Sequence, residues 1–441
     1  MNNTKSVAKS GKGSKSKLDK SEKTKNESAQ PVMAVKNQKQ AAEPEPAAPS
    51  GALAEVAALG ICMTKAESNT LRGLRQIAEG KDKQRLFVGV DVHKKQWHVA
   101  VWSKEHDLLV ASWVTPSFYD GLSRIIRVAR ARIESVVYEA GPTGFSLARR
   151  LESDGWPVQV ISPAHTPRKP GGDDKSDRLD ARKLAEYSSK GLLHVVAIPT
   201  EQEEADRALA RQYGACTDDV RRAKMQIRSF LLFHGVAEPE GLEHWTRASR
   251  EALTRIELNL ELRATLDLLL KRLAQALELR SQALKCLRRL SQTERHAASV
   301  KRLRTVPGVG LIIATVFLCE LFRPKRFGSP RQVSRMLGLA PEVRSSGQSE
   351  ERGGRHAAGQ ARLRSLLVEG AWQWRRHDAN ALRLYQSQVS RSGLKQKAIT
   401  AVARKLGVIL WRIALGPRDY CPGLVNIPPG VFEGMKRRQA A

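Results

Sequence analysis

The sequence predicts a mixed α/β domain followed by a longer, almost entirely helical region. Between residues 85 and 162, short β-branched and aromatic runs alternate with amphipathic stretches, whereas strand patterns disappear beyond residue 200. A length of 441 residues is enough for two or three domains, each with its own core. We therefore expect a sheet domain over 85–200, a helical linker over 201–304, a helical C-terminal domain over 305–416 and a tail over 417–441.

The N-terminal segment 1–84 is expected to be a disordered basic arm. It is rich in Lys, Ser, Asn and Gly up to about residue 40 and then reads AAEPEPAAPS. Such a composition cannot bury enough apolar area to offset the entropy lost on ordering. Weak contact with DNA and a solubilising extension are both open as functions, and the pattern over 53–79 permits a helix.

Strands and helices of the sheet domain follow from residue 85 onward. Three adjacent strands are predicted in RLFVGVDV, KQWHVAVWS and DLLVASWVT, with turn residues between them. Helical spacing follows in SFYDGLSRIIRVARAR, a strand in ESVVYEA, a helix in GPTGFSLARRLESDG and a strand in PVQVIS. A strand meander that leads into alternating helix and strand describes a mixed sheet with helices against its faces.

The helical region begins with a basic amphipathic helix over 218–234. Leucines near a 3.5-residue rhythm then predict an antiparallel or dimeric coiled coil: Leu266, Leu270, Leu273, Leu277, Leu284 and Leu287. Further on, VPGVG permits either a tight turn before a helix or a hairpin whose amides meet a DNA phosphate. A polar Gly-rich loop, RSSGQSEERGGRHAAGQ, precedes the last helices, and the tryptophans Trp97, Trp372, Trp374 and Trp411 are expected in cores.

The charge of the chain favours nucleic acid as a partner. There are 75 Lys and Arg against 45 Asp and Glu, a formal net charge of +30. Such a surface attracts phosphate backbones, with an affinity that weakens steeply with salt. No segment approaches the roughly 18 apolar residues of a membrane span, and five scattered cysteines support neither a zinc site nor a disulfide framework. With no secretory signal pattern, we expect a cytoplasmic protein without membrane contact.

Four acids stand out in this basic chain. Asp91 and Glu139 each close an apolar predicted strand, and Asp177 and Asp180 lie three apart where a helix should begin. Turn formation explains a single strand-end acid and helix capping explains one of the aspartates, but neither explains all four. Carboxylate oxygens are the ligands that Mg²⁺ prefers, and two such ions can promote phosphoryl transfer. The pattern predicts a two-magnesium site that acts on DNA.

Several segments, in order, give the chain a family resemblance. VGVDVHKKQWHVAV, YEAGPTGF, SPAH, DKSDRLDARKLAEY, VPGVG and the block from LGLAPEVRSSGQ to LRSLLVEGAW lie between about residues 85 and 415. Together they resemble the insertion-sequence transposases of the IS one-ten family, which also includes site-specific DNA invertases. The resemblance implies an RNase H-like (RuvC-like) domain with Asp91, Glu139, Asp177 and Asp180 as a DEDD tetrad, joined by a coiled coil to a C-terminal transposase domain.

The same resemblance implies a serine nucleophile in the second domain. The family's Ser-Gly falls on Ser346, with Ser345 as the neighbouring candidate. Arg344, Arg352 and Arg355 of this segment are expected to hold phosphate. Where relatives carry a GGITKxGNxxLR-like run, this chain has GGRHAAGQARLR, so nucleic-acid contacts there are expected to differ.

Partners are implied as well. Family members use a structured bridge RNA, so RNA guidance is implied, and strand exchange between two duplexes calls for a dimer or tetramer. The basic helix with Arg221, Arg222 and Arg228 is a candidate nucleic-acid surface. Two other functions stay open: a hydrolytic RuvC-like nuclease such as a junction resolvase, in which water attacks, and a non-catalytic nucleic-acid-binding protein.

Overall fold

The computed structural model describes residues 64–141, 143–162, 177–346, 349–355 and 359–422, and for residue 177 and for those of 342–355 only the backbone. Most of the predicted N-terminal arm and most of the predicted tail therefore lie outside the described residues. Within the described part, no helix is long and apolar enough to cross a membrane. The four described cysteines are free thiols.

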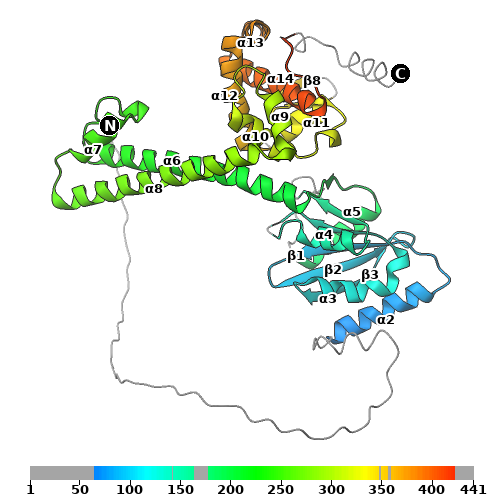
Figure 1. The fold of residues 1–441 in the computed structure, drawn as a ribbon. Helices are drawn as coiled ribbons and strands as arrows, with labels where there is room; N and C mark the ends of the chain where they lie inside the picture. The colour runs from blue at the N-terminus through cyan, green and yellow to red at the C-terminus, as the bar shows by residue number, and fades with distance from the viewer. Residues whose placement is uncertain (1–63, 142, 163–176, 347–348, 356–358, 423–441) are drawn as a thin grey trace, which may run out of the picture. The chain divides into compact units, whose positions relative to one another are not determined.

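A six-stranded mixed sheet forms the first part of the fold, in the order β3-β2-β1-β4-β5-β6 (Figure 1). β1 to β3 form an antiparallel meander, β4 and β5 run parallel to β1, and β6 is an antiparallel edge. The five longer strands agree with the sequence prediction, whereas β6 has only two residues and was not predicted. The strands are β1 (Leu86–Val92), β2 (Gln96–Ser103), β3 (Leu108–Pro116), β4 (Ile133–Glu139), β5 (Val158–Ile161) and β6 (Val195–Val196).

Helices cover both faces of this sheet (Figure 1). One face packs on α2 (Lys65–Glu79), α3 (Tyr119–Ile126), the 3₁₀ helix η1 (Arg127–Arg132) and α4 (Ser146–Ser153) in a single apolar core. Strand residues such as Val88 and Val90 point into that core. Leu74 of α2 is buried in it too, so the core of the sheet domain includes a helix upstream of residue 85. The other face packs on α5 (Asp177–Ser189).

A long antiparallel helix pair, α6 (Glu201–Phe233) with α8 (Leu260–Ser291), follows the sheet domain. Residues 220–231 of α6 share a core with 266–276 of α8, while 210–213 share one with 287–290, so the two helices run in opposite directions. The predicted leucines all pack, in an antiparallel arrangement within one chain. α6 begins well before the predicted start because Thr200 and Glu203 form a capping box. The short η3 (Leu242–His244) and α7 (Arg247–Thr254) connect the pair.

The C-terminal region is a helical bundle around Phe317, Leu367 and the fully buried Trp374. It contains α9 (Glu294–Leu303), α10 (Leu311–Leu321), the 3₁₀ helix η4 (Pro324–Arg326), α11 (Pro330–Met336), α12 (Ala361–His377), α13 (Ala379–Ser392) and α14 (Lys395–Leu415). The expectation that the tryptophans lie in cores is confirmed, since Trp97 and Trp411 are also buried and Trp372 packs against the bundle core.

The polar Gly-rich segment was predicted as a loop, and that prediction is wrong. It forms a two-stranded antiparallel hairpin of β7 (Pro341–Ser346) and β8 (Ser349–Arg355). Side-chain hydrophobicity gave no sign of these strands, because PEVRSS and SEERGGR lack the β-branched alternation of a half-buried strand.

Candidate carboxylate site and serine hairpin

The position of α5 against β1 is set by Gly89. A Cβ atom at Gly89 would overlap the carbonyl oxygen of Ala181 and lie 2.6 Å from the amide nitrogen of Ala185. Two residues earlier on the same side of β1, Phe87 shares an apolar cluster with Ala185. Moving from Phe87 to Gly89 thus moves the contact from Ala185 toward Ala181, so α5 runs antiparallel to β1.

A second row of contacts links α5 to β4 in the same direction. Ser135 and Ser188 are joined by a 2.8 Å hydrogen bond between their hydroxyls. Val137 shares a buried cluster with Leu184. Two residues of a strand span about 6.6 Å and four residues of a helix span about 6 Å. Each advance of two residues along a strand is therefore matched by four residues of α5 in the opposite direction. The same spacing, extended by two strand residues and four helix residues, places Asp91 of β1 opposite residue 177. It likewise places Glu139 of β4 opposite Asp180.

Asp91 and Glu139 are also neighbours across the sheet. β1 and β4 are parallel, with Gly89 opposite Val137 and Val90 opposite Tyr138. The next position of this register sets Asp91 beside Glu139, on the face that α5 covers. Adjacent strands lie about 4.8 Å apart. The sheet register and the two contact rows therefore bring the backbone positions of all four predicted acids to one end of the sheet.

Cationic and imidazole groups accompany these acids. The Nε2 atom of His93 lies 3.0 Å from Oδ2 of Asp91, whose side chain is 19% exposed. The Nζ atom of Lys183 lies 3.9 Å from Oδ1 of Asp180. His93 directly follows the last residue of β1, two positions after Asp91. Lys183 lies three residues after Asp180 on α5, and this spacing could have predicted the pair from the sequence.

The described side chains contain no group of three or more His, Cys, Asp or Glu residues placed to hold a metal ion. The side chain of Asp177, one of the four predicted ligands, lies outside the described residues. What the described part offers is a donor set made of carboxylate oxygens at a strand end. That chemistry fits a hard divalent cation better than a soft one.

The connection that follows Glu139 is held in place by Tyr138. The Tyr138 hydroxyl donates a hydrogen bond to the carbonyl of Gly144 and accepts one from the amide of Ala148. Burial raises the pKa of Tyr138 to about 12, so the phenol stays protonated and keeps its donor. The backbone just after the acid is thereby tied to the start of α4.

Ser346 closes β7, at the end of the hairpin farthest from its base. It pairs with Ser349, and Ser345 pairs with Glu350. The base is anchored in the helical bundle, where a Cβ at Gly359 would lie 2.5 Å from the amide nitrogen of Gly338. The three predicted phosphate-binding arginines belong to the hairpin strands, but their side chains lie outside the described residues: Arg344, Arg352 and Arg355.

The predicted basic surface of α6 is locally neutralised. Each of its three named arginines forms a surface ion pair, Arg221 with Asp218, Arg222 with Asp219 and Arg228 with Glu238. Exposed pairs of this kind exchange readily with water and contribute little energy.

VPGVG contains two glycines that are used differently. Gly308 has a φ of +82°, and a Cβ there would lie 2.7 Å from both the carbonyl of Gly370 and the amide of Trp374. This glycine is needed for the close approach of the turn to α12. Gly310 has no atom within 4 Å of the Cβ position and is exposed. The tight-turn reading therefore explains Gly308 and leaves Gly310 without a packing role.

The contacts that place the carboxylates include residues the sequence reasoning missed. Gly89 interrupts an apolar strand, which is a known sign of close backbone approach. Ser135 and Ser188 gave no comparable signal, since a serine pair separated by 53 residues has no local pattern.

Two family profiles match this chain. A profile of DEDD transposases of the IS110 type, described as "Transposase", matches residues 88–235, which include all four acids. A second, described as "Transposase IS116/IS110/IS902 family", matches residues 300–386, which include the serine hairpin.

Individual relatives agree with the profiles. A Sinorhizobium fredii protein with the name transposase y4qE is 33% identical over 366 residues, which cover 77% of this chain and 90% of the relative. The transposase for insertion sequence element IS1111A of Coxiella burnetii is 26% identical, over 77% and 92% of the two chains. That for IS1328 of Yersinia enterocolitica is 28% identical, over 65% and 82%. The chain belongs to the IS110/IS116/IS902 family of transposases.

Proposed function

We propose that this protein cleaves and rejoins DNA strands during transposition, with the tetrad Asp91, Glu139, Asp177 and Asp180 and the nucleophile Ser346. Three observations together carry the proposal: the contacts of α5 with β1, the contacts of α5 with β4, and the parallel pairing of β1 with β4. Together they lead the backbone positions of the four acids to one end of the sheet. This supports our proposal that the domain is RNase H-like (RuvC-like). Capping or turn formation gives no reason for that convergence.

The four carboxylates would hold the divalent metal, in our proposal two Mg²⁺ ions. When bound, such ions assist deprotonation of an attacking hydroxyl and stabilise charge on the leaving oxygen. In their absence, clustered carboxylates would repel a DNA phosphate, so the site needs cations to accept its substrate.

Ser346 is proposed to attack the phosphorus of a DNA phosphodiester. A bond forms between serine Oγ and phosphorus, the bond from phosphorus to one sugar oxygen breaks, and the serine proton is transferred to that leaving oxygen or to solvent. The phosphoserine ester keeps the energy of the broken strand, and attack by a sugar hydroxyl of another strand rejoins the DNA and frees the serine. Arg344, Arg352 and Arg355 are proposed to stabilise the phosphate.

A structured guide RNA and a homo-oligomer complete the proposal. Both are supported by family membership and by the net charge of +30, which suits binding of more than one nucleic-acid strand.

The test uses element-end DNA, magnesium and the cognate RNA, with products separated by denaturing electrophoresis. Asp91→Asn is expected to lower cleavage by more than about 100-fold, because metal-bound charge stabilisation is worth several kcal/mol. Glu134→Gln is the matched control, since Glu134 is an exposed acid on the same strand as Glu139. Ser346→Ala is expected to abolish the covalent protein–DNA adduct and the joined product.

The hydrolytic alternative predicts different products. If Ser346→Ala still yields joined strands, the serine assignment is wrong. Free DNA ends without any adduct in the parent protein would favour a RuvC-like nuclease in which water attacks. Binding that is indifferent to magnesium, together with no cleavage at all, would favour a non-catalytic binding protein.

A further inference from the structure

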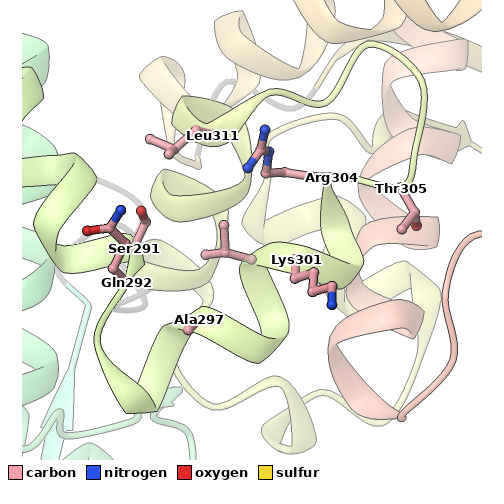
Figure 2. Close-up of a pocket in the computed structure, with 8 residues that line it drawn as sticks. Ser291, Gln292, Ala297, Lys301, Arg304, Thr305 and Leu311 are labelled. Atoms are coloured by element: carbon pink, nitrogen blue, oxygen red, sulfur yellow. The ribbon is translucent and has the colours of Figure 1, made fainter.

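A basic pocket lies where the end of α8, the helix α9 and the start of α10 meet (Figure 2). Its volume is about 520 Å³. Its lining includes the polar side chains of Ser291, Gln292, Lys301, Arg304 and Thr305, with Leu311 at the start of α10. Among the described residues, no aspartate or glutamate lines it. The pocket is thus a cationic hollow, and both of its cations lie within residues 300–386, which the second family profile matches.

The two cations of this pocket differ from those on α6. Lys301 and Arg304 are both exposed, and within the described part of the chain neither forms an ion pair with an acid. Arg221, Arg222 and Arg228 of α6 are each paired. Lys301 lies in the last turn of α9 and Arg304 is the C-cap residue of that helix, three positions later, so the helix end presents them as neighbours. Two unneutralised cations at a shared hollow favour an anion.

The opening of the pocket at the surface favours a polymer over a small enclosed ligand. Gln292 and both cations are exposed, and Gln292 can add a donor to an anion. Ser291 and Thr305 shape the wall without being available as donors, because their hydroxyls donate to the carbonyls of Arg288 and Arg302. The exposed Gly310 beside the pocket adds no side chain that would obstruct an approaching backbone.

We propose that this pocket binds a backbone phosphate of duplex DNA, held by Lys301 and Arg304 with Gln292 as an additional donor. The contact is separate from the tetrad and from the serine hairpin, and it is independent of sequence because a phosphate carries no base information. Its role is to position the duplex on the C-terminal helical region. The proposal rests on the DNA-binding part of the proposed function and on none of its chemistry.

The experiment measures binding of a short fluorescent DNA duplex by anisotropy, in EDTA, between about 50 and 200 mM salt. Lys301→Ala combined with Arg304→Ala is expected to weaken binding several-fold. The same change should reduce the slope of log affinity against log salt by about one, the effect of one lost phosphate contact. The control is Lys271→Ala combined with Arg272→Ala, two exposed cations of α8 that remove the same charge away from the pocket.

Each outcome decides the matter. A loss confined to the pocket variant supports the proposal. Equal slopes for the parent and the pocket variant, or an equal loss in the control, would overturn it. A loss for structured RNA of similar length but none for duplex DNA would also overturn it, in favour of an RNA phosphate. Because binding is measured in EDTA, without any cleavage, failure here is distinguishable from failure of the catalytic proposal. Unchanged thermal unfolding confirms that each variant is folded.

Discussion

Gly89 lies where α5 crosses β1, and its missing side chain decides how closely the two elements approach. Gly89→Ala would place a methyl group against the backbone of Ala181 and Ala185. Overpacking of this kind costs about 1–3 kcal/mol. We expect a lower thermal unfolding temperature and loss of DNA cleavage, since α5 carries Asp177 and Asp180.

The control for this change is Gly73→Ala in α2. Nothing lies within 4 Å of the Cβ position there, and alanine favours a helix over glycine by about 0.5–1 kcal/mol. This variant should unfold at the same or a slightly higher temperature than the parent. If Gly89→Ala behaves like Gly73→Ala, the close approach of α5 to β1 is not as described.

Asp206 gives the fold a specific dependence on pH. Burial alone would raise the pKa of this carboxyl, but hydrogen bonds from Arg295, His296 and Gln202 outweigh burial and lower it to about 2. Because the folded pKa lies below the ordinary value of 3.8, the stabilisation is fully present above about pH 4. It is lost as the pH falls toward 2 and amounts to roughly 2 kcal/mol.

The comparison that isolates Asp206 is with Asp206→Asn, which has no carboxyl to titrate. We expect the parent to unfold at a higher temperature than the variant at pH 6, and the difference to shrink steadily between pH 4 and pH 3. A difference that stays constant over this range would show that the ion pair with Arg295 does not hold the pKa down.

At the scale of elements, α6 is joined to α10 through a buried carboxylate. Glu320 is 5% exposed and receives two hydrogen bonds from Arg211, at 2.7 and 3.0 Å, while Arg207 lies 3.5 Å away. Glu320→Ala would leave these cations without their partner, at a cost of about 3–5 kcal/mol. Thermal unfolding of the variant should therefore start at a clearly lower temperature.

A surface pair on the same helix provides the control. Asp219→Ala removes the partner of Arg222, and an exposed pair is worth at most about 1 kcal/mol. If Asp219→Ala and Glu320→Ala lower the unfolding temperature by similar amounts, burial does not make the ion pair between α6 and α10 more stabilising than a surface pair.

The strands of the sheet were more predictable from the sequence than the packing of α5 against them. β1 to β5 were predictable, because apolar runs such as that around Val88 and Val90 are buried and bounded by turn residues. The acids at two strand ends could be predicted for the same reason. The alignment of α5 against the sheet could not be predicted, because it depends on the contact of Gly89 with helix residues 92 to 96 positions later in the chain. The β7–β8 hairpin was not predicted, because its residues pair as antiparallel strands but are not of the types that are typical of strands.

For the whole molecule, the two parts of the proposed chemistry lie on different regions of the chain. The acids belong to the sheet domain, whereas Ser346 belongs to a hairpin anchored in the helical bundle. The α6–α8 pair separates these regions in sequence. Such a division permits the serine of one subunit to serve the acids of another, in a dimer or tetramer in which each active centre draws on two chains.

Subunit mixing tests this arrangement directly. Asp91→Ala and Ser346→Ala are each expected to be inactive alone. In a mixed oligomer with shared centres, intact acids from the Ser346→Ala chain meet the intact serine of the Asp91→Ala chain, so joined DNA product should reappear at a fraction of the parent level. The covalent adduct should then form only on the Asp91→Ala chain, which a size tag on one variant would reveal by electrophoresis. If the mixture stays inactive although both chains co-purify, each centre is built from one chain, and the hairpin and the sheet end must meet within a single subunit.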